Sequence, residues 1–179
     1  MKYLALLRWI NVWGNNIMNM KVLENMMTHL WYTNVSTYLN TWNIFFSSSQ
    51  SEKEISIIIE QKIKEFFWLT ITVLIKDMES IEQIIQLLPS DRTNNKDYKT
   101  DIIFLRDTIS IDQARKDILT HPGIDHLLFS HDAILRHIHK AHYKESKMND
   151  FIKNKIYKYT TIRNCNTVRK IHTILQSMT

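Results

Sequence analysis

Residues 44–76 read IFFSSSQSEKEISIIIEQKIKEFFWLTITVLIK, and this stretch decides the fold class that the chain is expected to adopt. The apolar run Ile44–Ser47 is typical of a strand, and Ser51–Phe67 has apolar residues at helical spacing. Ser51 and Glu54 have the spacing of a capping box, which marks the first turn of this helix. Leu69–Lys76 is again apolar and β-branched. The stretch therefore predicts a strand, a helix and a second strand.

The rest of the chain extends this pattern on both sides. Before the stretch, we expect a strand over Lys2–Val12, a helix over Met20–Leu30 and a strand over Val35–Leu39. After it, a helix over Glu79–Leu88 ends at Pro89. A second series of elements follows a polar segment. It comprises strands over Asp101–Arg106, His126–Ser130, Ala133–His139 and Tyr159–Ile162 and helices over Ile111–Leu119, Lys147–Tyr157 and Thr167–Ser177.

Each half of the chain thus has the order βαββαβ with a trailing helix, which is the ferredoxin-like arrangement. The sequence predicts an α+β protein with two such halves and two antiparallel sheets. We expect a first subdomain at residues 1–90, a linker at 91–100 and a more basic second subdomain at 101–179. The apolar pattern also predicts a buried core. Its members are Leu4, Leu6, Ile10, Leu23, Met27, Ile44, Phe46, Ile59, Ile63, Phe67, Ile71, Val73, Ile103, Leu105, Ile118, Leu127, Phe129, Ile134, Ile152, Ile156, Val168 and Ile171.

The composition is that of a globular protein. The 179 residues are 44% hydrophobic and 23% charged, so the chain can form a core and does not resemble a disordered protein. Its single cysteine, Cys165, cannot form an internal disulfide. The apolar run at the amino terminus stops at Arg8, too early for a secretory signal, and we find no membrane span. We therefore expect a cytoplasmic protein without a membrane partner.

Positive charge is concentrated in the second half. Residues 1–95 carry 8 basic and 9 acidic side chains, whereas residues 96–179 carry 15 and 9. A basic half favours an anionic partner such as a small molecule, a nucleotide or RNA. RNA is not favoured, because the first strand has none of the aromatic pattern of an RNA-recognition sheet. A solvated basic surface without a ligand is the competing interpretation.

Glycine is rare and tryptophan is frequent, with two and five residues respectively. Trp31 and Trp68 each follow the last helical residue, where a glycine with positive φ commonly ends a helix. Trp42 lies at a hairpin turn, and Trp13 precedes the loop that leaves the first strand. A bulky residue at positive φ costs about 1–2 kcal/mol.

The chain resembles an uncharacterised bacterial family, the domain of unknown function DUF 1697, over nearly its whole length. The family opens with LLRGINVGG, and Leu6–Gly14 reads LLRWINVWG here. His29–Asn43 reads HLWYTNVSTYLNTWN beside the family's TYxxSGN, and Thr161–Lys170 reads TIRNCNTVRK beside TxRNwNTxxK. The family also tends to have a glycine near a Ser-Lys pair. His139–Lys147 contains the Ser-Lys pair but no glycine.

The resemblance implies that the tryptophans stand where relatives have glycine. Trp9, Trp13, Trp31 and Trp42 each replace a family glycine, and Trp68 stands at the helix-end position described above. A single cause fits all five: the source organism reads UGA as glycine, whereas the translation read it as tryptophan. In the competing interpretation, the tryptophans are genuine and form an aromatic surface that stacks nucleic-acid bases.

Polar residues in three segments are candidates for a ligand site. The first segment is the loop after the first strand, where a glycine turn exposes backbone N–H groups. The second is the hairpin turn before Ile44, and the third is the start of the last helix, where an arginine beside a helix terminus can bind an anion. We expect these segments to converge on one cleft between the halves. The candidate residues are Arg8, Asn11, Gly14, Asn15, Asn43, Arg163, Asn164, Asn166, Thr167 and Lys170. Turn and cap formation is the competing role for all of them.

Other reactive side chains lack a recognisable pattern. His137 and His139 share a face of a strand, but His131–His142 has no spacing that specifies a third metal ligand, so we expect neither metal nor cofactor. Cys165 has no nearby Asp–His pattern. We therefore expect a binding module for an anionic small ligand or nucleotide. An enzyme of unknown reaction and a structural or interaction protein are the alternatives.

Overall fold

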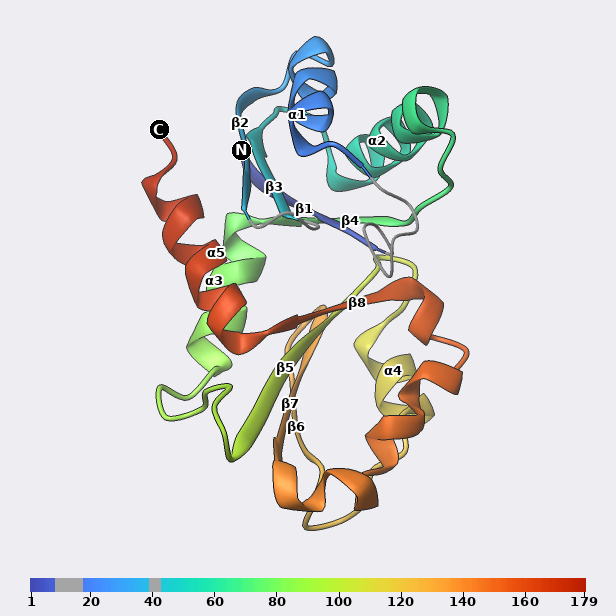
Figure 1. Cartoon of the computed structure of the whole chain (residues 1–179), viewed down its shortest axis with the longest axis vertical. Coiled ribbons are helices and arrows are strands. Elements are labelled where there is room, and N and C mark those ends of the chain that lie inside the picture. Colours follow the sequence, from blue (N-terminus) through green and yellow to red (C-terminus); the bar gives the residue numbers. More distant parts are fainter. Residues whose placement is uncertain (9–17, 39–42) are drawn as a thin grey trace. The chain divides into compact units, whose positions relative to one another are not determined.

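The computed structural model describes residues 1–8, 18–38 and 43–179. The chain divides into two compact units, Met1–Glu79 with Thr173–Thr179, and Ser80–His172. Each unit contains one four-stranded antiparallel sheet with helices (Figure 1). This confirms the predicted α+β class with two antiparallel sheets. The expected subdomain boundaries at residues 91–100 stay a prediction.

The sheet of the first unit has the strand order β2-β3-β1-β4, and every neighbouring pair is antiparallel. Helices α1 and α2 lie on the same face of this sheet (Figure 1). The elements are β1 (Lys2–Leu7), α1 (Met20–His29), β2 (Thr33–Tyr38), β3 (Asn43–Ser47), α2 (Glu52–Phe67), β4 (Val73–Asp77) and α3 (Met78–Leu87), the last of which continues into the second unit.

The capping box predicted for α2 is present. The backbone N–H of Ser51 donates to Oε2 of Glu54 at 2.9 Å, and the backbone N–H of Glu54 donates to Oγ of Ser51 at 3.4 Å. Apolar residues at helical spacing then place Ile55, Ile59 and Ile63 in the core that α2 forms with the sheet. Local signals in the sequence are thus sufficient to start and orient this helix.

Two tryptophans end helices in left-handed backbone conformation. Trp31 has φ of 64° and follows α1, and Trp68 has φ of 57° and follows α2. At the end of α1, the N–H of Tyr32 donates to the carbonyl of Met27 and the N–H of Trp31 to that of Thr28, which is the Schellman arrangement. Both indole side chains are about 90% exposed. The prediction of positive φ and exposed rings is confirmed at these two positions, whereas Trp9, Trp13 and Trp42 lie outside the described residues.

The sheet of the second unit has the order β6-β7-β5-β8, again antiparallel throughout. One face of it packs against α4 and the turns that precede β8, through a core that includes Ile103, Ile134 and Phe151. The elements are β5 (Tyr98–Leu105), α4 (Ile111–Asp117), β6 (His126–Phe129), β7 (Ala133–His139), β8 (Thr160–Asn164) and α5 (Cys165–Ser177), whose last residues belong to the first unit.

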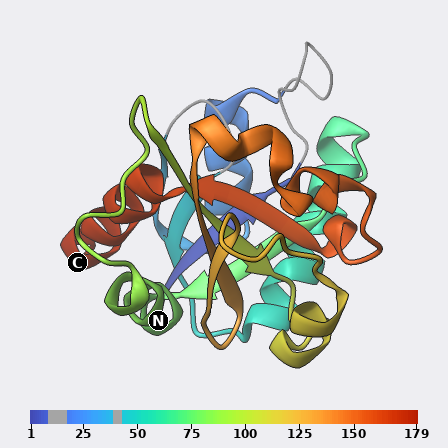
Figure 2. The ribbon, with the colours of Figure 1, turned by 90° about the horizontal axis from the view of Figure 1, so that it is seen from below.

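The helix predicted over Lys147–Tyr157 is wrong. Three short 3₁₀ helices, Lys140–Glu145, Lys147–Lys153 and Tyr157–Tyr159, occupy this region and follow one another in Figure 2. A local and a distant contact both favour the turns. Oδ1 of Asn154 accepts a hydrogen bond from the N–H of Ile156, and such side-chain bonds compete with a continuous helix. The N–H of Lys147 donates to the carboxylate of Asp125.

The predicted core is largely correct. Ile152 is the error, because it is 58% exposed once the expected α-helix is replaced by 3₁₀ turns. Phe67, Leu127 and Phe129 are half-buried, and Ile10 lies outside the described residues. The other predicted core residues are buried. Within the described residues, no helix has the length and apolar character needed to cross a membrane.

Candidate functional site

A row of polar side chains crosses one face of the second sheet. Thr100 on β5 pairs with His137 on β7, and His137 pairs with His126 on β6. Directly opposed residues of antiparallel strands share a face, so the three side chains lie side by side. The next row on the same face is apolar, because Leu135 pairs with Leu128. A polar row thus borders an apolar floor.

The chain that follows α3 lines this face with the strands and creates a cavity of about 400 Å³, which we call the histidine pocket. Leu88 and Pro89 add apolar surface, and Arg92 adds a positive charge. All lining residues belong to the second unit. They are Leu88, Pro89, Arg92, Thr100, Asp125, His126, Leu127, Leu128, Leu135 and His137.

His137 is the least ordinary group in the histidine pocket. It is 8% exposed, and its ring stacks on Tyr98 with centroids 5.0 Å apart. The pKa of His137 is lowered to about 4, mainly by burial and also by the positive charge of Arg92 and the proximity of His126, against the opposing charge of Asp91. The imidazole is therefore neutral at physiological pH.

One ring nitrogen of His137 is bonded and the other is not. Nδ1 lies 2.7 Å from Oγ1 of Thr100. Nε2 is buried and has no hydrogen-bond partner among the residues that the structure describes. A buried polar atom without a partner costs stability, so this nitrogen needs an explanation.

A second cavity, of about 410 Å³, lies on the opposite face of the same sheet, where Lys99, Asp101, Arg136 and Asn164 contribute to its wall. The buried Arg136 donates to Oγ of Ser146 at 2.7 Å, and Nη2 lies 3.9 Å from Oδ1 of Asp125. Lys99 and Asp101 form an ion pair at 3.3 Å. The charges in this cavity therefore compensate one another.

The buried cluster of Asp125, Ser146 and Arg136 is a structural junction. The carboxylate of Asp125 accepts hydrogen bonds from the Ser146 hydroxyl and from the backbone N–H groups of His121 and Lys147. Ser146 in turn caps the 3₁₀ helix that follows it. Ser146 and Lys147 thus connect the segment before β8 to the loop before β6.

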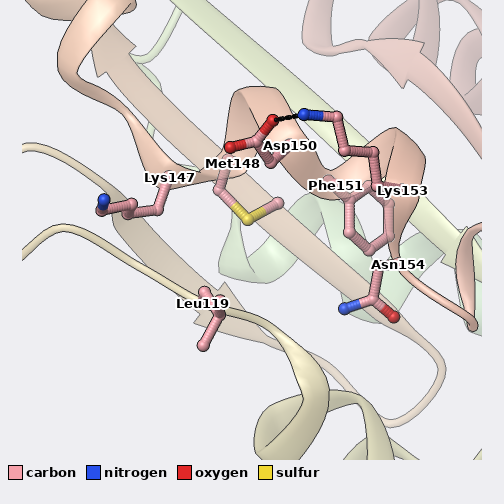
Figure 3. A pocket seen from close by; sticks show the side chains of 7 residues that line it. All are labelled: Leu119, Lys147, Met148, Asp150, Phe151, Lys153 and Asn154. Carbon is pink, nitrogen blue, oxygen red and sulfur yellow. Dashed lines mark hydrogen bonds and ion pairs between the residues drawn. The ribbon is translucent and has the colours of Figure 1, made fainter.

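An open groove of about 210 Å³ lies along the same 3₁₀ segment (Figure 3). Leu119 faces Met148 and Phe151 across it, and Lys153 pairs with Asp150 at 2.6 Å. The groove is therefore mainly apolar, and one of its two lysines is neutralised by that ion pair.

The candidate residues of the first unit are only partly described. Arg8 is buried just after β1, and its N–H donates to the carbonyl of Thr72 at 3.1 Å. Asn43 begins β3 and is 1% exposed, with Nδ2 donating to the carbonyl of Tyr38 at 3.2 Å. Asn11, Gly14 and Asn15 lie outside the described residues.

The candidate residues of the second unit lie at the junction of β8 and α5. Oδ1 of Asn164 caps the helix by accepting from the N–H of Thr167 at 2.9 Å, and Asn166 bonds to the carbonyl of Asn94 at 3.2 Å. Arg163 donates to Thr161 and to the carbonyl of Ile162, and burial lowers its pKa to about 10. Lys170 is exposed. The common site of these residues with Arg8 and Asn43 stays a prediction.

The histidine pocket was not among the sites expected from the sequence. The shared face of His137 and His139 is confirmed, since Tyr98 contacts both rings. The partner on β6 was missed, although a hairpin that pairs Phe129 with Ile134 also places His126 opposite His137. Register in the hairpin was therefore the signal that could have identified the pocket.

These features define a protein class: an α+β protein of two sheet-based units, with a small-molecule-sized cavity in the second. The family model described as a protein of unknown function, DUF1697, matches residues 1–127, so the chain belongs to that family. A solved structure, the conserved bacterial protein SP0830 from Streptococcus pneumoniae, is similar over 97% of this chain and 98% of its own, with 24% identity and a TM-score of 0.83. No curated protein matches.

Proposed function

We propose that this protein is a binding module for a small anionic ligand and that the histidine pocket is its binding site. The observation that carries the proposal is the neutral, buried His137, which lies beside the cationic Arg92 above an apolar floor. Small-molecule sites typically combine apolar surface with a few converging polar groups. A strongly shifted pKa in such a cavity is a further sign of a functional site.

The charges of the histidine pocket favour an anion. Arg92 can hold two oxygens of a phosphate or carboxylate group at once. Asp125 also lines the cavity, but its carboxylate is fully buried and bonded to the N–H groups of His121 and Lys147. The positive charge that the cavity presents is thus not cancelled by this acid. By contrast, Lys99 and Asp101 in the cavity on the opposite face neutralise each other.

A calorimetric titration with inorganic phosphate at pH 7 tests the proposal. We expect saturable binding to the natural chain, loss of at least tenfold in affinity for Arg92→Ala, and no change for Arg115→Ala. Arg115→Ala is the control, because it removes the same charge from an exposed arginine that lies over Phe129. Equal binding by both variants, or none by the natural chain, contradicts the proposed site.

We also propose that the five tryptophans are glycines in the source organism, which reads UGA as glycine. The left-handed conformation and the exposure of Trp31 and Trp68 support this, because glycine adopts positive φ without the steric cost that a side chain brings. A tryptophan that packed in the core would have argued against it.

The gene and the native protein test the recoding proposal directly. We expect UGA codons at all five positions, and glycine at each of them in peptides that are sequenced by mass spectrometry from the native organism. UGG codons at even two of the positions contradict the proposal.

A further inference from the structure

The Thr100 hydroxyl lies between two hydrogen-bond partners. Its oxygen is 3.1 Å from the carbonyl of Thr93 and 2.7 Å from Nδ1 of His137. A carbonyl oxygen can only accept, whereas an imidazole nitrogen can donate or accept. The arrangement that satisfies both contacts gives the hydroxyl proton to the carbonyl and the ring proton to Nδ1, which leaves Nε2 as an unprotonated acceptor.

The groups around His137 keep Nε2 unprotonated. The pKa of about 4 means that the ring does not take up a second proton at neutral pH. Tyr98 covers one ring face, and the Thr100 hydroxyl holds Nδ1. Titratable and charged groups approach from each neighbouring element. Those that act on the ring itself are Asp91 and Arg92 after α3, Tyr98 on β5 and His126 on β6. Behind them, His139 on β7 contacts Tyr98, and Cys165 on α5, itself near Arg169, interacts with Thr100.

A ligand of the histidine pocket must therefore satisfy two opposite requirements. It needs a negative oxygen for the guanidinium of Arg92 and a hydrogen-bond donor for Nε2 of His137. A fully deprotonated oxyanion such as sulfate presents only lone pairs to both groups, which leaves the nitrogen unbonded. A phosphate group that retains one proton meets both requirements, because it has charged oxygens and one P–OH.

We propose that the histidine pocket recognises a phosphate group in its protonated form, with Arg92 holding the charged oxygens and Nε2 of His137 accepting the hydrogen bond of the P–OH. This inference rests on the proposed function and specifies its ligand. Because Nε2 is buried, binding requires a side chain of the pocket wall to move.

Three probes distinguish the possible ligands. Inorganic phosphate retains a P–OH at pH 8, whereas methyl phosphate, like other monoesters with a second pKa of about 6, has lost its proton there. Sulfate has no proton at either pH 5 or pH 8. We expect inorganic phosphate to bind at both pH values and methyl phosphate to bind only at pH 5. Wherever either phosphate binds, its affinity is expected to be at least tenfold higher than that of sulfate. Binding of methyl phosphate at pH 5 would show that the pocket accepts an esterified as well as a free phosphate.

Calorimetry with these probes, on the natural chain and on Arg92→Ala, separates the two proposals. If sulfate and phosphate bind equally and Arg92→Ala abolishes both, the anion site stands and the requirement for a proton is wrong. If methyl phosphate binds equally at pH 5 and pH 8, the requirement for a proton is also wrong. If no probe binds, both proposals fail. Thr100→Val, which removes the hydroxyl that fixes the tautomer, is expected to reduce the preference for phosphate over sulfate.

Discussion

At the scale of single residues, the neutral imidazole of His137 links stability to pH. Its pKa is about 4 in the folded protein, whereas an unfolded chain has about 6.5. Between these values the unfolded state binds the proton and the folded state does not. The fold therefore loses stability as the pH falls from 6.5 to 4, by up to about 3 kcal/mol.

Denaturant unfolding at several pH values measures this effect. We expect His137→Gln to lose less stability than the natural chain between pH 6.5 and pH 4, because glutamine does not titrate. His131→Gln, at an exposed turn position, is the matched control and is expected to follow the natural chain. If the free energy of unfolding falls equally with pH in all three proteins, His137 is not held neutral by the fold.

The two helix-ending tryptophans make a second prediction at this scale. Trp31→Gly and Trp68→Gly remove a side chain from a left-handed position, so each is expected to raise the free energy of unfolding by about 1 kcal/mol.

Asn34 is the control, because it also has positive φ, at 55°. Asparagine tolerates this conformation, and Nδ2 of Asn34 donates to the carbonyl of Thr179. Asn34→Gly is therefore expected to give no gain. Thermal unfolding of the three variants checks these values, and destabilisation by both tryptophan changes contradicts the steric argument.

At the scale of secondary-structure elements, short-range signals predicted most of the molecule. The capping box of Ser51 and Glu54 and the apolar spacing of α2 are properties of adjacent residues, so they can be read before any tertiary contact is known. The segment before β8 is different. Its 3₁₀ turns depend on Asp125, which lies 22 residues before Lys147, and no local pattern reports such a contact.

The junction at Asp125 should therefore be important for stability. Asp125→Ala is expected to lower the free energy of unfolding by about 3 kcal/mol or more, because it leaves the guanidinium of Arg136 buried without a carboxylate. Asp112→Ala, on the exposed first turn of α4, is the control and is expected to change it by less than about 1 kcal/mol. Similar losses for the two variants in denaturant unfolding would argue against a structural junction.

At the scale of the whole molecule, the sequence predicted the class of fold and the basic second half, but not the cavity. Thr100, His137 and His126 come from three strands, and only the register of those strands brings the side chains into one row. Arg92 comes from a segment interpreted as a linker. A site assembled from residues that are distant in sequence and carry no motif can be located only once the pairing is known.

The central claim is that Nε2 of His137 accepts a hydrogen bond from the P–OH of an anionic ligand. Nitrogen NMR of the imidazole groups during a phosphate titration at pH 7 tests this claim most directly. We predict that the Nε2 signal of His137 begins at the position of an unprotonated nitrogen and moves on binding, while Nδ1 remains protonated. Arg92→Ala should abolish this shift. An Nε2 that is protonated from the start, or one that is unmoved at phosphate concentrations that stabilise the protein, contradicts the account.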